Sequence, residues 1–181
     1  MASQSAFVFL VDILFNLYLM VVILRIWLQL ARADFYNPLC QFVVKATHPV
    51  VGPLRRAIPP IGRLDTATLV FAFAIACIKV VSLALLMGVN FDVVAVLFSG
   101  AITLVKETFS VVFYVLILRA ILSWISQGYN PIEMVMGQLT EPMLSPIRKV
   151  IPPMGGLDLS ILILIIALQF FKILLFGGTM F

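Results

Sequence analysis

Hydrophobic residues in this chain are gathered in long blocks, which polar residues interrupt at only a few places. Four blocks, at residues 6–31, 66–87, 108–126 and 159–176, come close to or exceed the roughly 20 apolar residues that a helix needs to cross a bilayer. Composition agrees, because 63% of the residues are hydrophobic and 11% are charged, whereas a soluble domain is about 45–50% apolar. The sequence therefore predicts an all-α membrane protein with four transmembrane helices.

A further apolar segment, residues 91–105, precedes the third block. One helix through both would be about 52 Å long, well beyond the hydrocarbon core of about 30 Å. We therefore expect Gly100 to divide an interfacial outer segment from the span itself.

A motif of 29 residues occurs twice, once in each half of the chain. Residues 37–65 and 130–158 lie 93 positions apart and share 12 identical residues, most of which are prolines or polar residues. We interpret the chain as two repeats, residues 1–90 and 91–181, each consisting of a helix, an amphipathic loop and a second helix. Because two spans return the chain to its starting side, we expect the repeats to be parallel.

Polar and proline residues predict the course of both motif loops. Asn37 and Asn130 are typical N-caps, and each precedes a short amphipathic helix that is expected to lie in the headgroup plane. A Thr-x-Pro sequence should end that helix, and the tandem prolines that follow should turn the chain. Asp65 and Asp158 stand directly before the second helix of each repeat. We favour an N-cap role for them, and an ion or partner contact is the alternative.

Four arginines occur at matching places in the two halves. Arg55 and Arg148 lie in the loops, where contact with lipid headgroups is favoured and an ion pair with the aspartate that follows is the alternative. Arg25 and Arg119 lie near the ends of the first and third blocks, close to Trp27 and Trp124, and we expect them to snorkel to the headgroups.

Two lysines, Lys79 and Lys172, lie deep in the second and fourth hydrophobic blocks. They are 93 positions apart, and each lies about 21 Å beyond the start of its helix. An ionisable residue at that depth is expected to pair or to serve a function. Their depth predicts two ion pairs, Asp12–Lys79 and Glu107–Lys172, and a structural clasp is favoured over part of an ion path.

Basic residues in the short loops indicate the orientation of the chain, because they accumulate on the cytoplasmic side. The opposite side offers only Lys106, so we expect both motif loops in the cytoplasm and both termini outside, which is the periplasm in a Gram-negative cell. The net charge of +4 then reflects topology and attraction to anionic headgroups, and no nucleic-acid partner is expected. The seven basic residues of the loops are Arg32, Lys45, Arg55, Arg56, Arg63, Arg148 and Lys149.

The pattern N-P-(x)8-T-x-P-x(3)-P-[LI]-R-[RK]-x-I-P-P-x-G-x-L-D follows a membrane helix that ends in Arg and Trp, and it resembles the YggT family, also called YlmG. The first copy departs from the family at His48, where an acidic residue is common, and at Arg63, where a second glycine is usual. The resemblance implies a small multi-pass protein of the bacterial inner membrane, associated with osmotic- or salt-stress tolerance and ion homeostasis. Cyanobacterial and plastid relatives are associated with division, nucleoid distribution and membrane-complex maturation.

We do not expect an enzyme, a cofactor or a metal site. The chain has a single histidine, His48, without a counterpart in the second motif, and it shows no nucleophile–base set, phosphate loop or metal-ligand spacing. The resemblance implies no catalytic residue either.

Two functions stay open from the sequence. The first is ion transport, through a path at the repeat interface or between protomers of a homo-oligomer, with the charges inside the spans as candidate residues. The second is a scaffold or assembly factor, in which the motif loops present their basic residues to the lipid bilayer or to membrane-protein partners.

Overall fold

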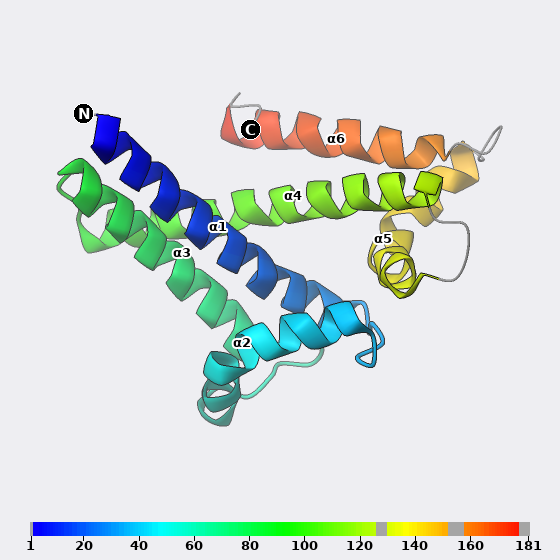
Figure 1. Ribbon diagram of the computed structural model, residues 1–181, viewed down its shortest axis with the longest axis horizontal. Helices are drawn as coiled ribbons and strands as arrows, with labels where there is room; N and C mark the ends of the chain where they lie inside the picture. The colour runs from blue at the N-terminus through cyan, green and yellow to red at the C-terminus, as the bar shows by residue number, and fades with distance from the viewer. Residues whose placement is uncertain (1, 126–129, 152–157, 178–181) are drawn as a thin grey trace. The chain divides into compact units, whose positions relative to one another are not determined.

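The computed structural model describes residues 2–125, 130–151 and 158–177. Within these ranges the chain forms six helices, and four of them are long and apolar enough to cross a membrane. The prediction of an all-helical protein with four such helices is confirmed. The helices are α1 (Ala2–Leu30), α2 (Pro38–Ala57), α3 (Thr66–Met87), α4 (Val93–Ile125), α5 (Pro131–Val150) and α6 (Leu159–Phe176) (Figure 1).

The chain divides into two compact units. Unit 1 consists of Met1–Leu30 and Phe42–Thr108, and unit 2 consists of Ala31–Gln41 and Phe109–Phe181. The division falls within α2 and α4, so each of these helices contributes to both units. The predicted boundary between the two sequence repeats, at residues 90 and 91, is a different division from that between the two compact units, and it stays a prediction.

Helices α1 and α3 form an antiparallel hairpin in unit 1. Near the start of α1, the Gln4 side chain donates to the carbonyl of Leu86, at 2.6 Å. Further along, the rings of Tyr18 and Phe71 meet edge to face with centroids 6.1 Å apart. The buried residues of α3 include several alanines, and such small side chains allow two membrane helices to approach closely.

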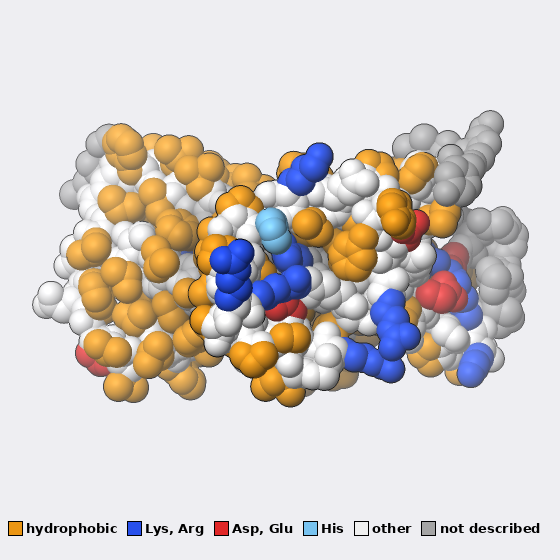
Figure 2. Space-filling view, turned by 90° about the horizontal axis from the view of Figure 1, so that it is seen from below, with side chains coloured by type: hydrophobic (Ala, Val, Ile, Leu, Met, Phe, Trp, Pro, Cys, Tyr) orange, Lys and Arg blue, Asp and Glu red, His pale blue; other side chains and the backbone are white. Residues whose placement is uncertain are grey.

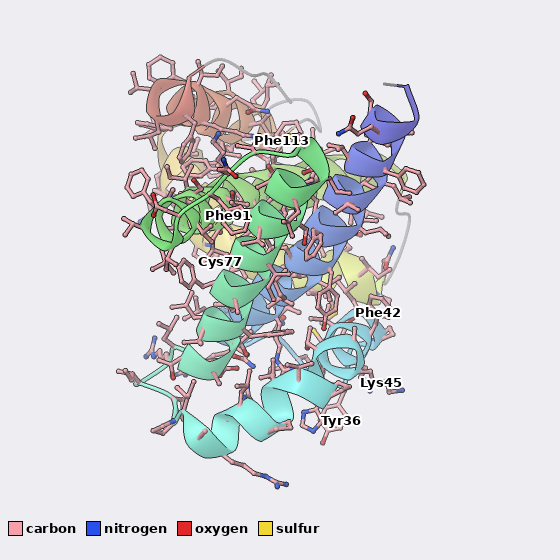
Figure 3. All side chains as sticks on the ribbon, turned by 90° about the vertical axis from the view of Figure 1, so that its left-hand side faces the viewer. Tyr36, Phe42, Lys45, Cys77, Phe91 and Phe113 are labelled. Carbon is pink, nitrogen blue, oxygen red and sulfur yellow. The ribbon has the colours of Figure 1, made fainter. Side chains whose placement is uncertain are left out.

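Helix α4 is continuous through Gly100, so the predicted division at that residue is wrong. The helix has 33 residues and is about 50 Å long. Gly100 is buried, and a Cβ atom built on it would lie 2.6 Å from the Sγ atom of Cys77. Figure 3 shows Cys77 on α3, beside the first part of α4. The glycine therefore permits close packing of α4 against α3 instead of breaking the helix.

Helices α2 and α5 are also continuous, whereas the sequence suggested that a Thr-x-Pro sequence would end each of them. Both contain two internal prolines, Pro49 and Pro53 in α2 and Pro142 and Pro146 in α5. Proline removes the N–H that would bond to the carbonyl four residues earlier. All four residues that carry those carbonyls are exposed, so solvent or headgroups can satisfy them. The ribbon of α2 bends partway along its length (Figure 1), as internal prolines cause.

Both amphipathic helices begin as predicted. The side chain of Asn37 accepts a hydrogen bond from the N–H of Leu39, and that of Asn130 accepts one from the N–H of Ile132, both at 3.0 Å. Gly62 has φ +62°, which permits the turn after the tandem prolines.

Unit 2 has a small apolar core to which three helices contribute. Leu116 of α4, Leu144 of α5 and Ile161 of α6 are buried together. In unit 1 the buried residues of α2 recur every three or four positions, as in a helix with one buried face. Hydrophobic side chains remain exposed over much of the surface in Figure 2, as expected where lipid is the solvent.

Candidate functional site

Unit 1 holds a group of polar side chains between its membrane-crossing helices, which we call the lysine cluster: Asp12, Asn16, Lys79 and Glu107. The Lys79 ammonium lies 3.0 Å from Asp12 Oδ1 and 3.7 Å from Glu107 Oε1, and it donates to Asn16 Oδ1. The Asn16 amide in turn donates to Asp12 Oδ2, at 3.0 Å. Asp12 and Asn16 are four residues apart on α1, so they occupy the same face of the helix.

The lysine cluster has unequal numbers of acidic and basic groups. Lys79 has a side chain only 9% exposed, and two carboxylates face its one ammonium. Burial of ions in a membrane is costly unless they are paired, which explains why these side chains come together. The predicted Asp12–Lys79 ion pair is confirmed.

A cavity of about 570 Å³ reaches Asp12 from the end of the hairpin where α1 begins and α3 ends. Asp12 is also the most exposed ionic member of the cluster, at 40%. The cluster is thus open to this cavity through one carboxylate. The cavity is lined by Gln4, Ser5, Val8, Phe9, Asp12 and Met87.

Lys172 of unit 2 has a simpler environment. Its ammonium donates to Ser110 Oγ, at 3.2 Å. Ser110 precedes Arg119 by nine positions, as Asn16 precedes Arg25, so both lysines contact a polar residue at the same place in the sequence pattern. The predicted Glu107–Lys172 pair would join residues of different units, and it stays a prediction.

A second group of polar side chains in unit 1, the first arginine cluster, joins α1, α2 and the start of α3. It contains Arg25, Thr47, Arg55 and Asp65. Arg25 is 2% exposed and donates from Nη1 to Thr47 Oγ1, at 2.5 Å, and to the carbonyl of Val44, at 3.4 Å. The expectation that Arg25 snorkels to headgroups is therefore wrong, because the guanidinium turns toward α2.

Arg55 and Asp65 complete this cluster. Arg55 donates from Nε, at 3.1 Å, and from Nη2, at 2.5 Å, to Asp65 Oδ2. Asp65 also accepts hydrogen bonds from the N–H and the hydroxyl of Thr68, so it caps α3 as predicted. With its amide oriented to satisfy both of its polar atoms, Gln29 joins Arg55 to Asp65.

Unit 2 contains the second arginine cluster: Arg119, Thr140, Glu141, Arg148 and Asp158. Arg119 donates to the Thr140 hydroxyl and, from Nη2, to Glu141 Oε2, at 3.2 Å. Arg148 donates from Nη1 to both oxygens of Glu141, at 2.8 and 2.9 Å, and from Nε to Asp158, at 3.0 Å. Asp158 caps α6, because it accepts from the N–H of the residue two positions later, at 3.1 Å.

The ion pairs bear on two alternatives that the sequence left open. Arg55 and Arg148 both pair with the aspartate that follows, so the ion pair that was the alternative is present in both units. Contact of these arginines with headgroups stays a prediction. The snorkelling expected of Arg119 is wrong, because its guanidinium binds the side chains of α5.

The arginines hold nearby carboxylates in the charged form. Burial alone would raise the pKa of Asp65, but hydrogen bonds from its arginine and from Thr68 outweigh burial and bring the pKa below the ordinary value. The same balance lowers the pKa of Asp158 and of Glu141. All three carboxylates are therefore charged acceptors at neutral pH.

Sequence reasoning found the repeated arginines and aspartates but missed the threonine in each cluster. Thr47 and Thr140 are identical in both motifs, and that identity was the available signal. By its pattern alone, each threonine belongs to a Thr-x-Pro sequence that predicts a helix end. Both hydroxyls instead donate to the carbonyl four residues earlier, at 2.7 Å, and accept from an arginine.

Within the described ranges, no group of three or more His, Cys, Asp or Glu residues has the arrangement of a metal site. The chemistry of the three clusters is thus that of ion pairs, amides and hydroxyls.

Comparison with known proteins gives a consistent result over nearly the whole chain. A family model described as CCB3/YggT matches residues 4–86 and again residues 98–179. An "Uncharacterized protein in proC 3'region" of Vibrio alginolyticus is 56% identical over 170 residues, covering 92% of this chain and 91% of the relative. "Uncharacterized protein YggT" of Escherichia coli K12 is 45% identical over 169 residues, covering 91% and 86%. No solved structure matches this chain.

Proposed function

This chain belongs to the CCB3/YggT family, and from that membership we propose that it is a multi-pass protein of the bacterial inner membrane that contributes to osmotic- and salt-stress tolerance and ion homeostasis by ion transport. The transported species is a cation. The proposal assigns it no catalytic role, cofactor or nucleic-acid partner.

In this proposal α2 and α5 lie on the cytoplasmic side, both termini lie in the periplasm, and the two halves are parallel repeats. The excess of Lys and Arg in the motif loops supports the orientation. The repeat arrangement is supported by the two separate matches to one family model and by equivalent contacts, Arg55–Asp65 and Arg148–Asp158, in the two arginine clusters.

The lysine cluster is the observation that carries the proposal. Ionisable groups within a membrane span are costly, and they commonly mark ion pathways. The Lys79 ammonium lies beside two carboxylates, Asp12 and Glu107, and Asp12 faces the cavity, so a cation that enters the cavity meets a carboxylate. The arrangement therefore provides a cation site whose occupant competes with the lysine.

The cavity beside Asp12 gives this site an entrance. In the proposed mechanism, a cation from the periplasmic side reaches Asp12, and the Lys79 ammonium then shifts its hydrogen bonding toward Asn16 and Glu107. The cation is next released toward the cytoplasmic end of the hairpin. Lys79 acts as a tethered counter-ion, which lowers the cost of the empty site.

The test is flux through purified protein in liposomes under potassium, sodium and proton gradients. We expect flux above that of protein-free liposomes, with at least about a tenfold loss in Asp12→Asn and in Glu107→Gln, since each removes a charge worth more than about 1.4 kcal/mol. Lys45→Gln is the matched control, because Lys45 is exposed on α2 (Figure 3) and lies outside the clusters. Folded wild-type protein without flux for any of the three cations would refute the proposal.

The second candidate function is a scaffold or assembly factor, which the two arginine clusters favour. They fasten α2 to α1 and α5 to α4, while Arg56 and Lys149, which occupy equivalent positions, remain exposed. Those residues would meet membrane-protein partners or a second copy of the chain. Arg56→Gln with Lys149→Gln should then reduce crosslinked partners while helix content stays constant, and undiminished crosslinking would exclude this role.

A further inference from the structure

The two arginine clusters differ at one position that changes their chemistry. In unit 2, Glu141 follows the shared threonine and accepts hydrogen bonds from both arginines. In unit 1, His48 follows the threonine, and its side chain is exposed. The first arginine cluster therefore lacks the carboxylate that bridges the second.

The charges of the two clusters differ accordingly. The second contains two arginines and two carboxylates, Glu141 and Asp158, so its formal charge is 2 − 2 = 0. The first contains two arginines and one carboxylate, Asp65, so its formal charge is 2 − 1 = +1. An anion is the group that would bring the first cluster to the neutral state of the second.

The same arginine atoms are involved in both units. Arg119 Nη2 and Arg148 Nη1 hold Glu141 in unit 2. Their counterparts, Arg25 Nη2 and Arg55 Nη1, donate to no residue in the part of unit 1 that the structure describes. Within the described residues, these two N–H-bearing atoms thus have no acceptor and are available to an anion.

Burial makes this difference energetically important. Arg25 is 2% exposed, and its Nε atom has no hydrogen-bond partner among the described residues. Its acceptors, the Thr47 hydroxyl and the Val44 carbonyl, are neutral. The nearby Asp65 carboxylate acts on Arg25 through space but is already paired with Arg55. A buried guanidinium that only shares a counter-charge is costly, so a ligand that supplies negative charge would stabilise the fold.

An opening lies next to the cluster. A cavity of about 360 Å³ is lined by Gln29, Arg55, Pro60, Arg63 and Asp65. Its volume is about ten times that of one water molecule in the liquid, about 30 Å³, so a phosphate group fits within it. Arg63 adds positive charge here, and the second motif has Gly156 at the matching position. Of the two departures of the first motif, Arg63 adds positive charge to the cavity itself, and His48 leaves the cluster without the carboxylate of the second motif.

We propose that the first arginine cluster binds a phosphate group between Arg55 and Arg63, which line this cavity, and that the phosphate supplies the negative charge that the Glu141 carboxylate supplies in the second cluster. Phosphate offers several oxygens to guanidinium groups and forms charge-assisted, bidentate hydrogen bonds with them. The phosphate belongs to a lipid headgroup or is free in solution, and the chemistry of recognition is the same. Figure 2 shows basic side chains gathered near the histidine on this face of the molecule.

The test measures binding to full-length protein in detergent by native mass spectrometry, with phosphatidylglycerol and, as a lipid with an uncharged headgroup, monogalactosyldiacylglycerol. A separate arm measures the change in melting temperature with inorganic phosphate. We expect selective binding of phosphatidylglycerol, or stabilisation by phosphate if the ligand is soluble. His48→Glu supplies an internal carboxylate and should weaken binding by about tenfold, the size of one charge-assisted hydrogen bond, whereas the neutral control His48→Gln should bind as wild type.

Arg63→Gly gives an independent variant that restores the residue of the second motif without altering the helices. It should also weaken binding, while Lys149→Gln in unit 2 should not. The proposal is overturned if neither probe binds wild-type protein, or if His48→Glu and Arg63→Gly both bind like wild type. These outcomes do not depend on ion flux, so they are distinguishable from failure of the proposed transport.

Discussion

Replacing Gly100 by alanine tests the close contact between α3 and α4. The added methyl group would lie 2.6 Å from Cys77 Sγ and 3.4 Å from the Cys77 Cα and N atoms, so the sulfur must move. Overpacking of this kind costs about 1–3 kcal/mol, whereas alanine is favoured over glycine within a helix by about 0.8–1 kcal/mol. The net expectation is a loss of stability of about 0–2 kcal/mol.

Gly137 of α5 provides the matched control, since among the described residues no atom apart from the nearby backbone of its own helix lies within 4 Å of a Cβ built there. Gly137→Ala should therefore gain the helix preference alone, about 0.8–1 kcal/mol. Because the helix preference for alanine is common to both variants, the difference between their free energies of unfolding measures the cost of the contact with Cys77 alone. That cost should be about 1–3 kcal/mol. Unfolding of purified protein in detergent, followed by circular dichroism, measures both.

The double variant Cys77→Ala with Gly100→Ala removes the sulfur that the new methyl group would meet. Relative to Cys77→Ala alone, Gly100→Ala should then be neutral or stabilising. The reasoning is refuted if Gly100→Ala stabilises the protein as much as Gly137→Ala does. It also fails if removal of the sulfur leaves the cost of the methyl group unchanged.

Three further predictions concern the clusters. Thr47→Val removes the hydroxyl that accepts from the buried arginine of α1 and should lower the free energy of unfolding by about 1.5–3 kcal/mol. Thr140→Val should cost less in the same assay, because its arginine keeps a carboxylate, and equal losses would contradict this. The pKa values of Asp65 and Asp158 are lowered, so these carboxylates stabilise the folded state fully above the ordinary pKa of about 3.9. That stabilisation is lost as pH falls through the lowered pKa values. The melting temperature should therefore decline in that acid range, and Asp158→Asn should make the decline smaller. Lys79→Met removes the ammonium that pairs with Asp12 and should cost on the order of 3 kcal/mol. Lys79→Arg should recover most of that loss in denaturant unfolding.

Where a polar cap adjoins an apolar block, the sequence predicted helix bounds well. Asp65 and Asp158 stand before the blocks 66–87 and 159–176, and α3 and α6 begin and end at those residues. The cap marks where hydrogen bonding within the helix begins. The start of α4 was missed by 15 residues because no cap precedes the block at residue 108, and Gly100 was interpreted as a boundary. A glycine in a helix can instead serve packing, and only the position of α3 shows this.

The proline-rich helices show a different limit. Pro49 and Pro142 predicted helix ends, since proline removes a backbone donor. Whether that loss ends a helix depends on the carbonyl left without a partner, and here it belongs to exposed residues, Lys45 and Gln138. Whether these carbonyl-bearing residues are exposed depends on how the helices of a unit pack together. The local sequence therefore could not decide whether each helix ends at its proline or continues through it with a bend.

The charges of the clusters were visible in sequence, but the way they are satisfied was not. Burial of Arg25 and partial burial of Arg119 follow from their direction toward α2 and α5, and nothing in the spacing of α1 and α4 fixes that direction. Once the direction is known, the substitution of His48 for an acidic residue acquires a physical meaning. One cluster neutralises its second arginine with Glu141, whereas the other has no carboxylate for that purpose. The first cluster therefore keeps a net positive charge beside the cavity that Arg55 and Arg63 line, and this difference between the two motifs supports the proposed phosphate site.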